Sequence, residues 1–85
     1  MTFTSKEIDS ISTKEDFADF ISGLREELTN NPDEWENQTL DRFLDAMESW
    51  IRMIDAYSKN TGDVEALSPS WKTFAKILCA AKVYE

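Results

Sequence analysis

Histidine is absent from the 85-residue chain, and cysteine occurs once, as Cys79. Without an imidazole, the usual base that activates a serine or cysteine nucleophile is missing. A single cysteine excludes an internal disulfide, and the chain has no thiol cluster of the kind that binds zinc. We therefore expect no catalytic residue and no metal site, and we expect Cys79 to be a half-buried core thiol.

Glycine and proline are also scarce, with two residues each. Two glycines leave little room for tight hairpin turns, and no run of alternating apolar and polar residues indicates a strand. A glycine-rich phosphate-binding loop is missing as well, so we expect no nucleotide cofactor. These absences favour an all-α fold that functions without a bound cofactor.

Basic residues are in the minority, because nine lysines and arginines stand against 17 acids and give a formal net charge of −8. Nucleic acid and anionic membrane surfaces bind clustered basic side chains, so the charge argues against both as ligands. An acidic surface suits a basic protein partner, or serves solubility alone. No apolar run reaches the roughly 18 residues of a membrane span, and no signal peptide is visible, so we expect a cytoplasmic protein.

The chain does contain apolar residues at helical spacing, which predicts helices over residues 13–29, 39–58 and 69–84. Thr39 is a suitable N-cap for the second helix, and Gly62 can take the left-handed conformation after its end. Ser68 and Pro69 are the expected start of the third helix. The apolar side chains of the second helix form one wide arc, made up of Leu40, Phe43, Leu44, Met47, Trp50, Ile51, Ile54 and Tyr57.

Together these elements predict one domain over residues 1–85, a compact three-helix bundle with a short N-terminal extension. In this fold Ile8 and Ile11 cover one end of the bundle. Trp35 lies among carboxylates in the loop 31–37, and we expect it to fold inward with its indole N–H at a wet rim. The alternative is that Trp35 is a partly exposed anchor for a binding partner.

One polar pattern on the second helix suggests a contact surface. Its members share a stripe beside the apolar arc and are Asp41, Asp45, Glu48, Arg52 and Asp55. In one interpretation Lys72 and Lys76 of the third helix neutralise these acids. In the other, the stripe faces outward and attracts a basic protein, with Trp35, Asp41, Asp45 and Glu48 as the contact residues.

Two further hypotheses belong to other functional classes. Carboxylates are plentiful enough for a small hydrolase that uses a carboxylate pair, which would need a cleft that raises the pKa of one member. A structural or self-associating protein is the other possibility. In that case apolar surface near Met53 would form a weak homodimer, and otherwise the chain is a monomer.

Two segments of the chain have a specific pattern of residues. The first is Trp35-Glu36-Asn37-Gln38-Thr39-Leu40 with Phe43-Leu44-Asp45-Ala46-Met47 and Trp50-Ile51, and the second is Pro69-Ser70-Trp71 with Ala75, Leu78, Ala80-Ala81 and Tyr84-Glu85. Over residues 13–85 the chain resembles a family of small acidic bacterial proteins that are known as a domain of unknown function.

This resemblance implies no activity and no cofactor for any residue. Small acidic bacterial proteins often serve as immunity proteins that block a toxin enzyme, which is an analogy of size and charge. We therefore expect a non-enzymatic, acidic protein-binding module, such as an immunity or inhibitor protein for a basic partner.

Overall fold

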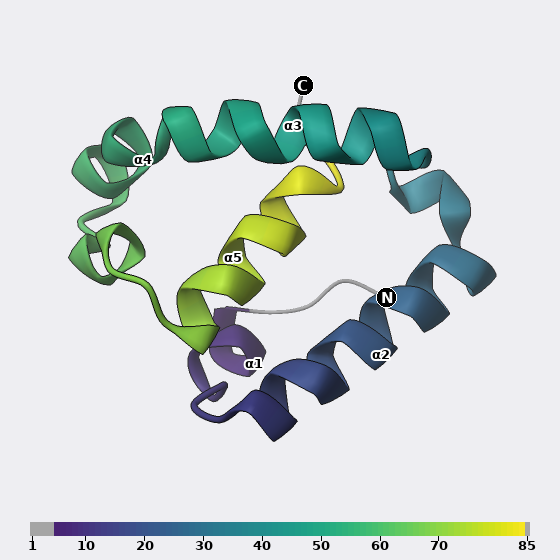
Figure 1. Cartoon of the computed structure of the whole chain (residues 1–85), viewed down its shortest axis with the longest axis horizontal. Coiled ribbons are helices and arrows are strands. Elements are labelled where there is room, and N and C mark those ends of the chain that lie inside the picture. The colour runs from purple at the N-terminus through teal and green to yellow at the C-terminus, as the bar shows by residue number, and fades with distance from the viewer. Residues whose placement is uncertain (1–4, 85) are drawn as a thin grey trace.

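The computed structural model describes residues 5–84, which form five α-helices and two short 3-10 helices and contain no strand (Figure 1). The prediction of an all-α fold is thus confirmed for this part of the chain. The elements in order are α1 (Ser5–Asp9), α2 (Lys14–Asn30), η1 (Pro32–Glu34), α3 (Leu40–Arg52), α4 (Ile54–Thr61), η2 (Val64–Leu67) and α5 (Trp71–Ala81).

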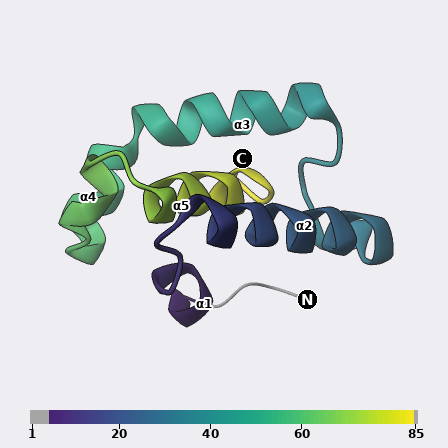
Figure 2. The same ribbon diagram turned by 60° about the horizontal axis from the view of Figure 1, so that its bottom comes forward.

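The last helix, α5, lies at the centre of the molecule, with α2 and α3 on either side of it (Figures 1 and 2). It packs against α1, α2, α3 and η2. The described chain is therefore not simply three helices in a bundle. Five helices are present, and four elements gather around the one that comes last in the sequence.

The predicted helix over residues 39–58 is divided at Met53 into α3 and α4. Met53 has φ −102° and ψ 12°, and its N–H donates to the carbonyl of Trp50 at 3.1 Å. The bend brings Tyr57 back toward Trp50, with ring centroids 5.1 Å apart, and packs α4 against η2. Gly62 ends α4 with φ 76°, which confirms its predicted left-handed cap.

Hydrogen-bonding side chains determine where the helices begin. Thr13 caps α2, since its hydroxyl accepts from the N–H of Asp16 at 3.1 Å and the Asp16 carboxylate accepts from the N–H of Thr13 at 3.3 Å. Thr39 caps α3, as predicted. The third predicted helix begins at Trp71 and not at residue 69, because Ser70 is its N-cap and accepts from the N–H of Thr73 at 3.0 Å.

The end of α5 is held by a side chain from the loop that precedes α3. Asn37 is buried, and its Nδ2 donates to the carbonyls of Ala81 at 2.8 Å and Tyr84 at 2.7 Å. The backbone N–H of Asn37 donates to the carbonyl of Lys82 at 3.0 Å. These bonds satisfy carbonyls that a helix end leaves free, and α5 stops at Ala81 instead of continuing to residue 84.

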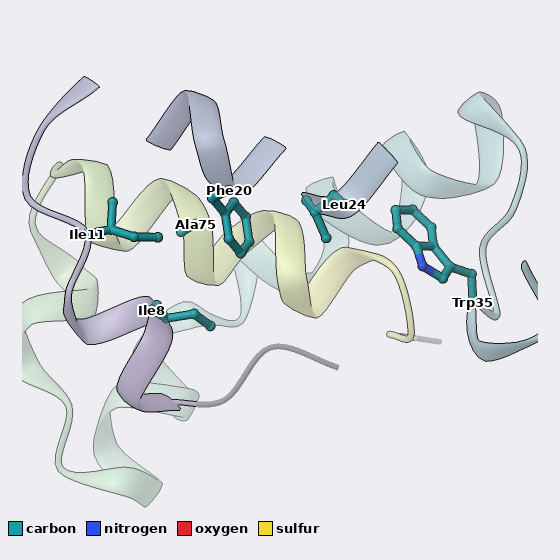
Figure 3. Packing of buried hydrophobic residues seen from close by; sticks show 6 residues of the cluster. All are labelled: Ile8, Ile11, Phe20, Leu24, Trp35 and Ala75. Carbon is teal, nitrogen blue, oxygen red and sulfur yellow. The ribbon is translucent and has the colours of Figure 1, made fainter. Parts of the chain in front are cut away.

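The apolar core extends along α5 (Figure 3). Ile8 and Ile11 are buried near the start of this helix, as predicted, and Trp35 lies near its end with 6% of its surface exposed. The ring of Trp35 stacks on Phe43, with centroids 5.7 Å apart. The expectation that Trp35 folds inward is thus confirmed. Ala75 of α5 is completely buried between these groups.

A buried ion pair accompanies Trp35. The side chains of Glu27 on α2 and Lys82 just after α5 are 2% and 4% exposed, and the Lys82 ammonium donates to Glu27 Oε1. The same carboxylate oxygen accepts the indole N–H of Trp35 at 2.8 Å. The expected wet rim for this N–H is therefore absent, because a buried carboxylate takes its place. The Lys82 ammonium also lies 5.9 Å from the centroid of the Trp35 ring.

Replacing Lys82 by Met should lower the free energy of unfolding by about 3–5 kcal/mol, because it leaves the Glu27 carboxylate buried without its counter-ion. The double variant with Lys82→Met and Glu27→Gln should recover a large part of this loss, since neither charge remains and Gln keeps an acceptor for Trp35. Urea unfolding followed by tryptophan fluorescence measures both. A double variant that is less stable than the single variant would contradict this account.

Candidate functional site

The outward face of α3 carries several exposed acids, of which only Glu48 forms an ion pair within the described chain. Asp41, Asp45 and Glu48 are all exposed. Arg52 forms an ion pair with Glu48 at 2.7 Å, whereas Asp41, Asp45 and Asp55 form none with any residue between 5 and 84. We call these five residues the acidic stripe, in which Asp55 lies on α4 and the others lie on α3. Three of its four carboxylates therefore have no counter-ion among residues 5–84.

The lysines of α5 do not serve the acidic stripe. Lys72 pairs with Glu65 at 3.5 Å, and Lys76 pairs with Asp63 at 2.5 Å. Both acids lie at η2, which folds back against α5 together with α4. Lys72 and Lys76 therefore form their ion pairs with other acids, and the interpretation in which they neutralise the acids of α3 is wrong.

Apolar side chains run along α3 beside the acidic stripe. Leu40, Leu44 and Ile51 are 73%, 51% and 43% exposed, and Met47 between them is half-buried. The continuous apolar arc predicts that this whole side of α3 faces the core, yet only one edge does so, where Trp50 is buried. Ala46, which lies just beyond that edge, is buried as well.

The exposed edge of the arc borders an apolar groove of about 330 Å³. Residues from α2, α3 and α5 line it, and they are Phe17, Met47, Ile51, Phe74, Ile77 and Leu78. The two outer helices provide its walls, and α5 provides its floor. Since Ile51 and Phe74 are 43% and 40% exposed, the groove is open to solvent.

An aromatic cluster lies at this groove. Trp71 is 39% exposed, and its ring centroid is 5.5 Å from that of Phe17 and 5.8 Å from that of Phe74. The partly exposed tryptophan is therefore Trp71, whereas Trp35 has almost no surface to offer a partner. The apolar spacing of Trp71 with Phe74, Ala75 and Leu78 predicts an inward position for its ring, whereas the ring is partly exposed. The position of Ser70 as N-cap, which places Trp71 in the first turn, is the signal that could have indicated its exposure.

A second hollow, of about 530 Å³, is lined by both polar and apolar side chains. In it Asp63 Oδ2 accepts from the Lys76 ammonium at 2.5 Å and from the Tyr57 hydroxyl at 3.3 Å. The hydrogen bond from Lys76 holds the pKa of Asp63 below its usual value. Burial raises the pKa of Tyr57, and the negative charge of Asp63 adds to this rise. Cys79 also lines the hollow, and burial raises the pKa of its thiol, which makes it a poor nucleophile.

A carboxylate-pair hydrolase would use one carboxyl group as a general acid. A general acid of that kind needs a raised pKa, yet the pKa of Asp63 is lowered, as are those of Glu15 and Asp16. Among the residues that the structure describes, no three His, Cys, Asp or Glu side chains gather where a metal ion would fit. Within the same residues, every helix is too short or too polar to cross a bilayer.

Replacing Asp63 by Asn should cost about 1–2 kcal/mol of stability at pH 7, since it removes a charged hydrogen bond. The lowered pKa of Asp63 means that its contribution is present above the ordinary carboxyl pKa and disappears as the pH falls through its folded-state pKa. Burial alone would lower the pKa of Lys76, but the hydrogen bond and charge of Asp63 outweigh it and raise that pKa. The contribution therefore persists up to about pH 10.

Urea unfolding of the wild type and the Asn variant at pH 7, 5 and 3 tests this prediction. The difference in stability should be constant between pH 7 and 5 and smaller at pH 3. Asp55→Asn is the matched control, because Asp55 is exposed and forms no ion pair with a described residue. A difference that stays the same at pH 3 would exclude ionisation of Asp63 as its source.

Comparison with known proteins places the chain in a family but does not assign an activity. A model of a family of unknown function, DUF7660, matches residues 13–85, from the N-cap of α2 onward. No curated protein and no solved structure matches the chain. The range and the lack of an assigned activity agree with the resemblance in the sequence. The chain therefore belongs to the DUF7660 family of unknown function.

Proposed function

We propose that the chain is a non-enzymatic protein-binding module, and that the acidic stripe on α3 and the start of α4 receives a basic protein partner. The supporting observation is that Asp41, Asp45 and Asp55 are exposed and have no counter-ion among residues 5–84. The five lysines and arginines with a described ion pair all serve other acids or the single Glu48 of the stripe. A surface of this kind accelerates encounter with a positively charged partner and disfavours acidic ones.

An immunity or inhibitor protein fits this character. Such a protein needs a stable scaffold and a complementary surface, and it needs no catalytic residue of its own. Asp41, Asp45 and Glu48 are the contact residues of the proposal, and Trp35 is left out because it is buried. The proposal includes a bacterial source, which the sequence resemblance implies, and a cytoplasmic location.

The test is to reverse the charge of the stripe with Asp41→Lys, Asp45→Lys and Glu48→Lys. Capture of the partner from a lysate of the source organism should fall about tenfold or more, because attraction becomes repulsion. The thermal midpoint should change by only a few degrees, since exposed charges contribute little to stability. Quantitative mass spectrometry of the captured proteins and a thermal scan provide the two measurements.

A matched control has the same net charge but leaves the stripe intact. It carries Asp19→Lys, Glu26→Lys and Asp33→Lys, at exposed acids of α2 and η1. The control should capture the same proteins as the wild type. If both variants lose the same proteins, net charge and not the stripe governs capture; if neither loses any, the stripe is not a binding surface.

A further inference from the structure

We infer that the apolar groove between α2 and α3 receives an amphipathic α-helix of the partner, with its apolar face in the groove and basic residues against the acidic stripe. This inference rests on the proposed function and specifies the partner's chemistry. It combines two independent features of one surface, which are exposed apolar side chains in a hollow and uncompensated charge along its edge.

Exposed apolar side chains form a row along α3. Isolated apolar residues on a surface are ordinary, but Leu40, Leu44 and Ile51 are aligned in this row. The row leads into the apolar groove, which Ile51 lines. From Leu40 to Ile51 the row is about 16 Å long, at about 1.5 Å of helix rise per residue. A partner helix of about three turns has the same length. Such a helix presents apolar anchors at three- and four-residue spacing, which is how helices bind in grooves.

The charge of the acidic stripe favours a basic helix over other possible occupants of the groove. Asp41 and Asp45 directly follow Leu40 and Leu44 in the sequence, so the acidic stripe runs parallel to the apolar row. A helix lying in the groove therefore has its flank beside the carboxylates, and Lys or Arg on that flank is complementary. A second copy of this chain is a poor occupant, because it would bring two acidic stripes and two charges of −8 together.

The aromatic cluster of Trp71, Phe17 and Phe74 should contribute most of the binding free energy, since tryptophan residues dominate many interfaces. Trp71 contacts Phe17 and Phe74, which both line the groove. An apolar side chain of the partner that enters the groove would cover these rings.

Three fluorescein-labelled synthetic peptides of 14 residues serve as defined probes. One is an amphipathic helix of leucine and lysine, the second replaces each lysine by glutamate, and the third keeps the lysines but has two central prolines that prevent a helix. By fluorescence anisotropy, the leucine–lysine helix should bind at least about tenfold more tightly than either of the others. Raising the salt concentration should weaken it.

The protein variant with Leu44→Gln and Ile51→Gln should bind the leucine–lysine helix about tenfold more weakly. The matched control carries Val64→Gln and Leu67→Gln, at apolar residues of η2 that are at least as exposed as Leu44 and Ile51, and should bind as the wild type does. Circular dichroism checks that both variants keep their helix content. Addition of the peptide should shift the methyl NMR signal of Met47, which lines the groove.

Equal binding of the three peptides, or equal losses in the two variants, would overturn the inference. So would a dimer in sedimentation that the Leu44 and Ile51 variant dissociates, because the groove would then hold a second copy. The proposed function is tested separately by lysate capture. If stripe reversal abolishes capture while Leu44→Gln with Ile51→Gln does not, the binding module stands and the helix-in-groove inference fails.

Discussion

The buried contact among Glu27, Lys82 and Trp35 is the constraint on which the rest of the structure depends. It joins α2 to the residues after α5 across 55 positions of sequence. Burying two charges is expensive, and their attraction compensates only when the geometry is good and further hydrogen bonds are made. The two buried charges are therefore tolerated only because the Glu27 carboxylate, the Lys82 ammonium and the Trp35 indole N–H contact one another directly. Asn37, two residues beyond the indole, holds the same end of α5 through three hydrogen bonds.

This constraint also explains why the molecule has an apolar groove. With α5 held against α2, α3 buries only one edge of its apolar arc, at Trp50, together with the adjacent Ala46. Ile8 and Ile11 fill the space on the α1 side of α5. No comparable element from residues 5–84 covers the side with Leu44 and Ile51, so the surplus apolar residues of α3 remain in solvent beside its acids.

Periodicity and capping chemistry predicted the helical class, the caps at Thr39 and Gly62, and the inward position of Trp35. They did not predict the break at Met53, because the apolar spacing continues through it without proline or glycine.

The buried pair was equally hidden, since charged residues are normally assigned to solvent. Its only sequence signal is spacing: Glu27 continues the row of Phe20 and Leu24, and both of these are buried. The ion-pair partners of Lys72 and Lys76 depend on how α4 and η2 fold back against the rest of the chain. No local sequence pattern predicts that fold-back.

The central position of α5 affects how the chain folds during translation. Helices α1, α2 and α3 leave the ribosome before α5, on which all three pack, and their apolar faces stay hydrated until it follows. Since synthesis adds only about 5–20 residues per second, this interval is long compared with helix formation. Nascent chains of this protein should therefore pass through a stage of secondary structure without a core, during which chaperones that recognise apolar segments can bind them.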